Sequence, residues 1–100
     1  MVQAGVYSGV LHYLKAVQTI GSKDPDQVAA KMRATPVKDM FARNGVLRDD
    51  GLMVHDLLLV RVKTPEASRT SWDLYDVLER IPGASAFPDV ATAGCPLVKS

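Results

Sequence analysis

The sequence has 100 residues, of which 47% are hydrophobic and 23% are charged, and its 12 basic and 11 acidic side chains leave a net charge of +1. This balance, with no cluster of Lys or Arg, argues against a nucleic-acid-binding protein. A chain of this length buries roughly 60 to 70% of its extended surface, so we expect one small folded unit or a piece of a larger one.

No segment has the composition expected for membrane insertion or export. The longest apolar runs, such as Leu57 to Val60, are far shorter than the roughly 20 residues that a membrane-spanning helix needs. The first residues, Met1-Val2-Gln3-Ala4-Gly5, lack the basic and apolar regions of a secretory signal. If the protein is exported, we expect its signal to lie outside these residues.

The first predicted helix covers about Ala4 to Ile20. Glycines are poor helix formers, so Gly5 and Gly9 predict a close approach of the backbone, with tight packing favoured over a ligand. Gly21 is expected to end the helix in the left-handed conformation. Apolar side chains recur at spacings of three and four and predict one buried face: Val10, Leu11, Leu14, Val17 and Ile20.

A second helix is predicted after Asp24, which is a good N-cap residue and is followed by a proline suited to the first turn. This helix should run to about Ala34, because Thr35-Pro36 disfavours its continuation. One more short helical turn is expected over residues 37–42, with Met40 and Phe41 as its anchors.

A β-hairpin is predicted over Asn44 to Lys63. Its turn, Arg48-Asp49-Asp50-Gly51, supplies acceptor side chains and a residue for positive φ. The following arm, Leu57 to Val62, should be buried on both faces at its start and on one face at its end. The rest of the chain would cover this arm.

The segment Trp72 to Ile81 has two interpretations. Its aromatic and β-branched content favours a strand, whereas the spacing of its apolar residues favours a helix, and the pattern alone does not decide between them. Pro82-Gly83 ends the segment in either case. Residues 84–100 are expected to be irregular, with at most one helical turn near Ser85 to Phe87.

Few residues suggest catalysis, and we expect no enzyme, no cofactor and no metal site. His55-Asp56 could form a general base, but neighbours on a strand point to opposite faces. A metal site from His12, His55 and Cys95 would lack a pair of ligands at short spacing. No nucleophile elbow or phosphate-binding glycine loop is present.

Two aromatic positions and one cysteine remain as candidates for binding or packing. Trp72 and Tyr75 are interpreted as core or interface anchors more than as a ligand platform. Tyr7, beside Gly5, is a candidate ligand contact because binding sites gather where loops enter helices. Cys95, the only cysteine, is either a small residue near a chain end or a half-cystine whose partner lies outside this sequence.

Several segments, in this order, resemble the C-terminal end of type I periplasmic binding proteins, the solute-binding receptors of branched-chain amino-acid-type ABC transporters. The resemblance covers nearly the whole chain and rests on these segments: Met1-Val2-Gln3-Ala4-Gly5-Val6-Tyr7-Ser8, Leu11-His12-Tyr13-Leu14-Lys15-Ala16-Val17, Val28-Ala29-Ala30-Lys31-Met32-Arg33, Asp50-Gly51-Leu52-Met53-Val54-His55-Asp56, Val62-Lys63-Thr64-Pro65, Trp72-Asp73, Ile81-Pro82-Gly83 and Gly94-Cys95-Pro96-Leu97-Val98.

The resemblance implies a periplasmic receptor of two α/β lobes, which closes on a small ligand and delivers it to an ABC permease. Residues 1–100 would be a single fragment, with 1–43 as the helical part of one lobe and 44–100 as a crossover, strands and C-terminal tail. It favours a strand for Trp72 to Ile81 and a disulfide from Cys95 to an absent cysteine. The residues implied at the interlobe cleft are Val2, Gln3, Ala4, Gly5 and Tyr7.

The expected fold is therefore α/β, or α+β as an isolated piece, and incomplete. Such a piece would expose apolar surface and form a homo-oligomer, by self-association or strand exchange. The first hypothesis is a fragment of an ABC importer's receptor for amino acids or other aliphatic or aromatic carboxylates, which does not bind ligand alone. The alternative is a truncated gene product that self-associates without a transport role. A hydrolase that uses His55 ranks last.

Overall fold

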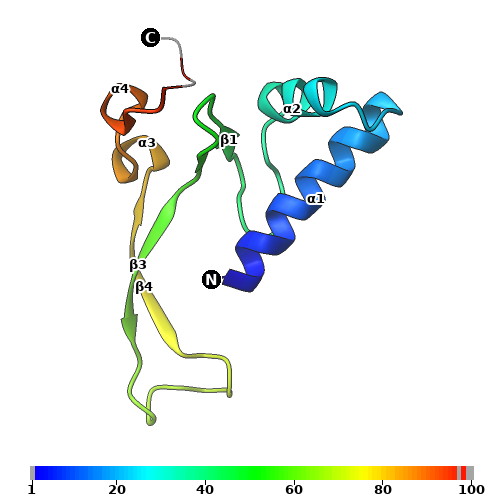
Figure 1. Cartoon of the computed structure of the whole chain (residues 1–100). Helices are drawn as coiled ribbons and strands as arrows, with labels where there is room; N and C mark the ends of the chain where they lie inside the picture. The colour runs from blue at the N-terminus through cyan, green and yellow to red at the C-terminus, as the bar shows by residue number, and fades with distance from the viewer. Residues whose placement is uncertain (1, 97, 99–100) are drawn as a thin grey trace.

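The structure, a computed structural model, describes residues 2–96 and 98. Two helices come first, followed by four short strands and two single helical turns (Figure 1). The elements in chain order are α1 (Val2–Ile20), α2 (Pro25–Ala34), β1 (Val46–Leu47), β2 (Met53–Val54), β3 (Leu57–Val62), β4 (Tyr75–Ile81), α3 (Gly83–Ala86) and α4 (Val90–Ala93).

Both predicted helices are confirmed, and local chemistry sets their ends. Gly21 has a φ of +65°, and its N–H donates to the carbonyl of Val17 at 2.9 Å, as expected for a helix-ending glycine. The carboxylate of Asp24 accepts from the backbone N–H of Gln27 at 3.0 Å and so caps α2.

The predicted buried face of α1 is wrong at Val10 and Leu14, whereas Leu11, Val17 and Ile20 are half-buried. The buried side chains of α1 are Ser8, His12 and Ala16, whereas Val10 and Leu14 are each 53% exposed. The reason is that α2 and the segment after it cover the face with small and polar side chains. No part of the described chain covers the opposite, apolar face to the same extent.

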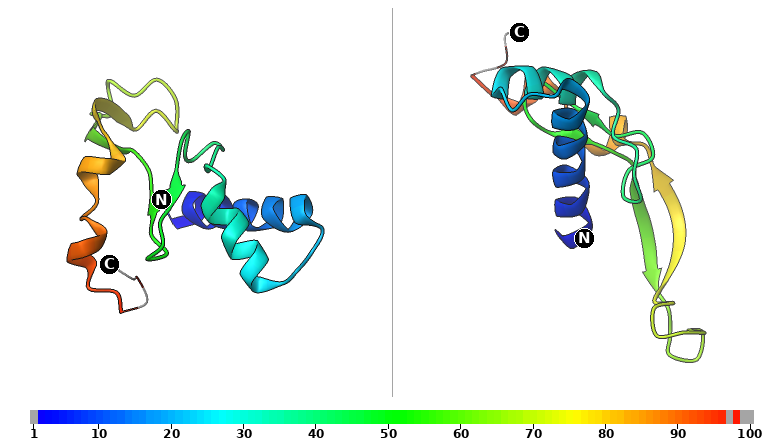
Figure 2. Two further views of the ribbon diagram at one scale, coloured as in Figure 1. Left: turned by 90° about the horizontal axis from the view of Figure 1, so that it is seen from above. Right: turned by 90° about the vertical axis from the view of Figure 1, so that its right-hand side faces the viewer.

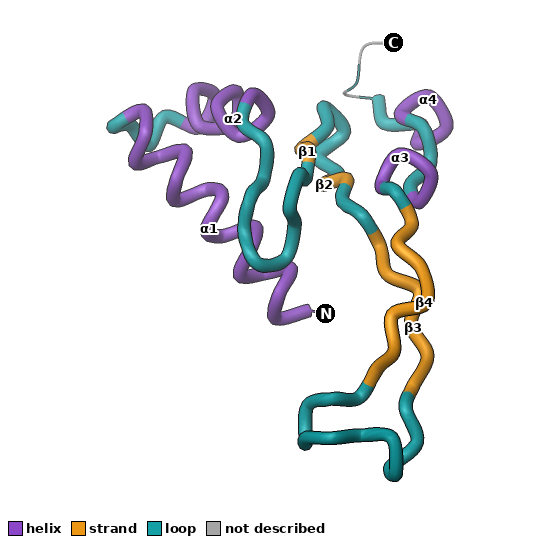
Figure 3. The backbone as a smooth tube through the Cα atoms, turned by 180° about the vertical axis from the view of Figure 1, so that it is seen from behind, coloured by secondary structure: helices purple, strands orange, loops and turns teal. Residues whose placement is uncertain are grey.

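The segment between α2 and β1 forms an extended loop, so the predicted helical turn over residues 37–42 is wrong. This loop runs back along α1 before it reaches β1 (Figure 3). Val37 and Gly45 exchange backbone hydrogen bonds of 2.7 and 2.9 Å across it. Val37 and Ala42 are buried, but Met40 is 82% exposed and anchors nothing.

The predicted β-turn is confirmed, but the hairpin that it joins is short. β1 pairs antiparallel with β2, and Gly51 in the turn has a φ of +82°. The predicted long arm does not continue this hairpin. It becomes β3, which pairs antiparallel with β4 in a separate two-stranded ribbon from Leu57 opposite Ile81 to Val62 opposite Tyr75.

The β3–β4 ribbon confirms a strand over most of the segment that had two interpretations. Its two strands twist around each other and extend away from the helices (Figure 2). Its apolar side chains are between 39% and 71% exposed, so the expected burial of this arm is wrong within this chain, which lacks elements to cover it: Leu58, Leu59, Val60 and Val62.

The molecule is therefore extended. Its radius of gyration is 16.8 Å and its principal extents are 52 × 33 × 17 Å, whereas a compact chain of 100 residues has a radius of gyration of about 13 Å. In the tail, one helical turn was expected near Ser85 to Phe87. The structure has α3 at this place, slightly earlier, and adds α4. Met1, Leu97, Lys99 and Ser100 lie outside the described residues.

Candidate functional site

The residues expected at a ligand cleft lie on the first two turns of α1. Val2 is 81% exposed and Tyr7 is 51% exposed, so the first turns present side chains to solvent. Gln3 is also exposed, and Ala4 and Gly5 are half-buried. The structure places these five residues together on one helix end, and their contact with a ligand stays a prediction.

The two glycines of α1 do not pack tightly against the rest of this chain. A Cβ atom built on Gly5 or Gly9 would meet nothing within 4 Å. The expectation of tight packing is therefore wrong within the described chain. The alternative, a close approach by a ligand, stays a prediction.

A polar contact fixes the N-terminal half of α1 to the loop before β1. The hydroxyl of Ser8 is fully buried and donates to Oδ2 of Asp39 at 2.6 Å. Oδ1 of Asp39 accepts from the N–H groups of Phe41 and Ala42, both at 2.8 Å. One carboxylate therefore shapes the loop and positions the helix.

The charge of Asp39 is stabilised by these contacts. Burial tends to raise its pKa, but the hydrogen bonds from Ser8, Ala42 and Phe41 outweigh burial, and the ammonium group of Lys15 adds to them. The pKa of Asp39 consequently lies below its ordinary value of 3.8. The carboxylate is ionised at neutral pH.

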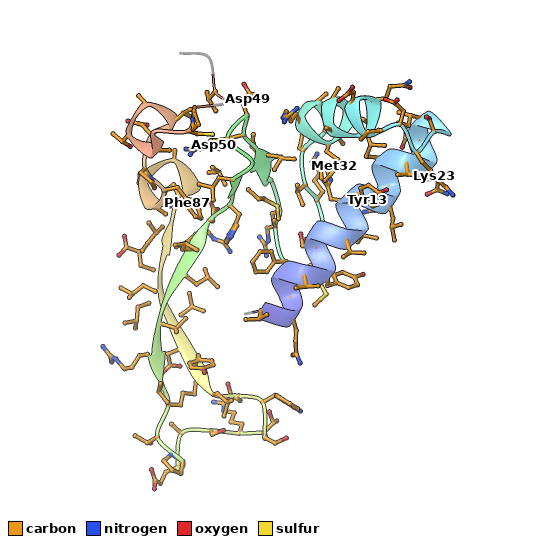
Figure 4. The ribbon with its side chains drawn as sticks, viewed as in Figure 1. Tyr13, Lys23, Met32, Asp49, Asp50 and Phe87 are labelled. Atoms are coloured by element: carbon orange, nitrogen blue, oxygen red, sulfur yellow. The ribbon has the colours of Figure 1, made fainter. Side chains whose placement is uncertain are left out.

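A second polar contact fixes the middle of α1 to α2. Nε2 of His12 lies 2.9 Å from the carbonyl oxygen of Met32, which can only accept, so Nε2 carries the proton. Figure 4 labels Met32 between α2 and α1. Sequence reasoning missed Ser8 and His12 as contacts, although Ser8, His12 and Ala16 recur at a spacing of four, the signal of one helix face.

His55 and Asp56 do not form a base and carboxylate pair. They lie in the link between β2 and β3. Nδ1 of His55 contacts the backbone carbonyl of Asp56 at 2.9 Å, and its ring packs edge-on against Phe41 and Phe87, at 4.7 and 5.5 Å between centroids. The carboxylate of Asp56 instead accepts from the N–H of Gly83 at 3.1 Å.

An arginine joins the β1–β2 turn to the tail. The guanidinium of Arg48 forms a two-point ion pair with Asp50, with Nε 3.1 Å from Oδ1, and its Nη1 donates to the carbonyl of Pro88 at 2.7 Å. Figure 4 shows Asp50 near the tip of this hairpin, beside the C-terminal helical turns. The hydrogen bond from Arg48 holds the pKa of Asp50 below its ordinary value.

The far end of the β3–β4 ribbon is held by one lysine. Nζ of Lys63 lies 2.7 Å from Asp73 and 3.4 Å from Asp76, and the hydrogen bond to Asp73 is the main cause of its raised pKa. Trp72 in the same loop is 88% exposed, and Tyr75 is 55% exposed. Neither aromatic residue is a core anchor in this chain. Their interpretations as interface anchors or as a ligand platform stay predictions.

Within the part of the chain that the structure describes, His12, His55 and Cys95 do not converge, and no cluster of three or more His, Cys, Asp or Glu side chains could hold a metal ion. Cys95 is a half-buried free thiol. None of the helices in residues 2–96 combines the length and the apolar character needed to cross a bilayer.

Comparisons with known proteins match this chain to periplasmic binding proteins. A family model described as a periplasmic binding protein matches residues 1–69. A solved periplasmic binding protein from Burkholderia mallei is 44% identical, with a TM-score of 0.85, and the match covers 93% of this chain and 24% of that one. No curated protein matches the sequence significantly.

A second solved structure is a branched chain amino acid ABC transporter periplasmic ligand-binding protein from Burkholderia xenovorans. It is also 44% identical, with a TM-score of 0.88 over 95% of this chain and 25% of its own. The chain thus spans about a quarter of the length of both structures.

Proposed function

The chain belongs to the periplasmic binding protein family, and from this membership we propose that it is the C-terminal part of a receptor that binds a small ligand for an ABC importer. Its helices and small antiparallel sheets are a partial piece of that fold. The observation that carries the proposal is 44% identity over nearly the whole chain to two periplasmic binding proteins.

The ligand that we propose is an amino acid or a related aliphatic or aromatic carboxylate, bound between two lobes. The transporter named for the Burkholderia xenovorans protein supports an amino acid. Val2, Gln3, Ala4, Gly5 and Tyr7 would contact this ligand.

The proposed receptor would work in the periplasm and would deliver its ligand to an ABC permease. Both matched structures are periplasmic binding proteins rather than enzymes, which supports a binding function without catalysis. In this setting Cys95 would form a disulfide with a cysteine elsewhere in the longer chain, since the periplasm is oxidising.

The 100 residues alone would not bind the ligand, because they provide one wall of the cleft. They would instead self-associate through exposed apolar side chains, which include Val2, Val6, Val10, Leu14 and the apolar residues of the ribbon. The same exposed surface supports the second candidate function: a truncated gene product that forms a homo-oligomer and has no transport role.

The size and location of the native product distinguish these two candidates. An antibody against residues 84–100 would be used on fractionated cells, and the mass of the detected band would be measured. We expect a periplasmic band several times larger than 10.8 kDa, the mass of this chain. A band near 10.8 kDa in the cytoplasm would support the truncated product and refute the receptor.

Calorimetry on the native product tests the assigned cleft residues. The probes are leucine, phenylalanine and benzoate. For a probe that binds, Tyr7→Ala should raise the Kd about tenfold, a loss of about 1.4 kcal/mol of binding free energy. Tyr13→Ala is the matched control, because Tyr13 is a half-exposed tyrosine on another face of the same helix. Equal affinity in both variants, or tight binding by the 100-residue chain alone, would contradict the assignment.

A further inference from the structure

A groove lies between α1, α2 and the loop that follows α2. Its cavity volume is about 190 Å³, below the roughly 300 Å³ at which pockets begin to hold drug-sized ligands. Ala16, Val37 and His12, all buried, contribute to its lining. The groove is therefore suited to a small ligand, and part of its lining is formed by buried side chains.

Three lysines from three different elements line this groove: Lys15 from α1, Lys31 from α2 and Lys38 from the loop. Among the described residues, none of the three forms a salt bridge. By contrast, Arg33, Arg48, Lys63 and Arg80 each have a carboxylate within 4 Å. Outside the groove, Lys23, Arg43, Arg61 and Arg69 also lack such a partner among the described residues. The three lysines are distinguished by lining one groove together.

Among the described residues that line the groove, one has a carboxylate, and its oxygens are already engaged. Asp39 accepts from the hydroxyl of Ser8 and from two backbone N–H groups. It offsets one of the three positive charges, so the groove keeps an excess of two, although the whole chain has a net charge of +1. Like charges that border one groove repel each other, and an anion bound in the groove would relieve this repulsion.

We propose that this groove is a binding site for a small phosphate-type dianion, either inorganic phosphate or a phosphate monoester. Lysine binds phosphate as a compact point charge, and a dianion matches the excess charge of the groove. Thr35 also lines the groove, and its hydroxyl can donate or accept a hydrogen bond.

The site is separate from the proposed ligand cleft and does not depend on it. Lys15 follows Tyr7 by eight residues, which is about 12 Å along the axis of α1. Figure 1 shows α2 above the C-terminal part of α1, away from its N-terminus. Occupancy of the groove would therefore stabilise the contact between α1 and α2 without filling the cleft.

Titration of the ¹⁵N-labelled 100-residue chain with inorganic phosphate tests the proposal. Ionic strength would be held constant with sodium chloride, because salt screens exposed charges. We expect saturable shifts of the amide signals of residues 12–19 and 31–39 with a Kd on the order of 1 mM. A parallel titration with glycerol 3-phosphate distinguishes the two kinds of anion. Tighter binding than that of inorganic phosphate would indicate a phosphate monoester, and weaker binding would indicate inorganic phosphate.

Matched charge variants distinguish a site from general attraction. The variant with Lys15→Gln, Lys31→Gln and Lys38→Gln should bind phosphate at least about tenfold more weakly. The control with Arg43→Gln, Arg61→Gln and Arg69→Gln loses the same charge outside the groove and should bind as the parent does. If the groove variant loses its helical signal, Lys38→Gln alone should weaken binding about threefold. Absence of saturable shifts, or equal weakening in both triple variants, would overturn the proposal.

Discussion

The helical half, residues 2–45, and the β3–β4 ribbon, residues 57–81, differ in where their apolar side chains lie. In the helical half a small core is formed by Ala16, Val28, Val37 and Ala42, and two buried polar side chains, Ser8 and His12, have hydrogen-bond partners. In the ribbon every residue from Leu58 to Arg80 on the two strands is exposed.

This difference shows that the two halves depend on packing to different degrees. The helical half closes on itself through few apolar residues and two long-range polar contacts, at sequence separations of 31 and 20. The ribbon is held by its ladder and by Lys63 at its far end, and an isolated two-stranded ribbon is marginally stable in water. In the proposed receptor, the absent elements would cover the ribbon.

The largest expected effect compares two valines that differ in burial. Val37→Ala leaves a cavity in the small core and should lower the free energy of unfolding by about 1 to 3 kcal/mol. Val62→Ala removes the same atoms from a side chain that is 71% exposed, and its effect should stay within about 0.5 kcal/mol. Urea unfolding followed by circular dichroism at 222 nm measures both. Equal losses would show that the ribbon contributes to the same core.

A pair of glycines tests the junction where the ribbon ends. A Cβ on Gly83 would lie 2.8 Å from Cγ1 of Val54 and 2.9 Å from backbone atoms of His55, so Gly83→Ala should destabilise the chain by about 1 to 3 kcal/mol. Gly5→Ala has open space in a helix and should stabilise it by about 0.5 to 1 kcal/mol. Thermal unfolding should show a lower Tm for Gly83→Ala and a higher Tm for Gly5→Ala. An unchanged Tm for Gly83→Ala would contradict the close contact.

Sequence reasoning located those features that depend on neighbouring residues. The cap at Asp24, the helix end at Gly21 and the turn at Gly51 follow from side chains and φ preferences within a few positions, and all three are confirmed. The order of short segments along the chain was enough to identify the family, which the comparisons confirm.

Features that depend on distant partners were not predictable in the same way. Ser8 is buried because Asp39 lies opposite it, and periodicity alone assigns burial to valines and leucines instead. The strand over Tyr75–Ile81 required its pairing with β3, which the pattern could not indicate. For the candidate site, position near a helix start suggested Tyr7 and Gly5, whereas only the resemblance pointed to Val2, Gln3 and Ala4. In the proposed receptor, residues outside this chain would form the other wall.

The smallest expected effect is a change in the pH dependence of stability, which differs in origin between the helical half and the ribbon. Asp39 and Asp73 both have a lowered pKa: hydrogen bonds outweigh burial at Asp39, and the hydrogen bond from Lys63 is the main cause at Asp73. A carboxyl group whose pKa is lower in the folded state stabilises the fold above its unfolded pKa of about 3.9, and this contribution is lost as pH falls through the folded value. The free energy of unfolding of both halves should therefore fall below about pH 4.

Two variants assign this acid response to its source. Asp39→Asn should flatten the pH dependence of the helical signal at 222 nm, because a neutral side chain no longer titrates at the contact with Ser8. Asp73→Asn should instead flatten the pH dependence of the fluorescence of Trp72, the only tryptophan, which lies next to Asp73 in the ribbon loop. Asp49→Asn, with a side chain 82% exposed, is the control and should change neither response. If Asp39→Asn altered the Trp72 signal as much as the helical one, the halves would unfold as one unit, and the contrast in burial would not divide the chain energetically.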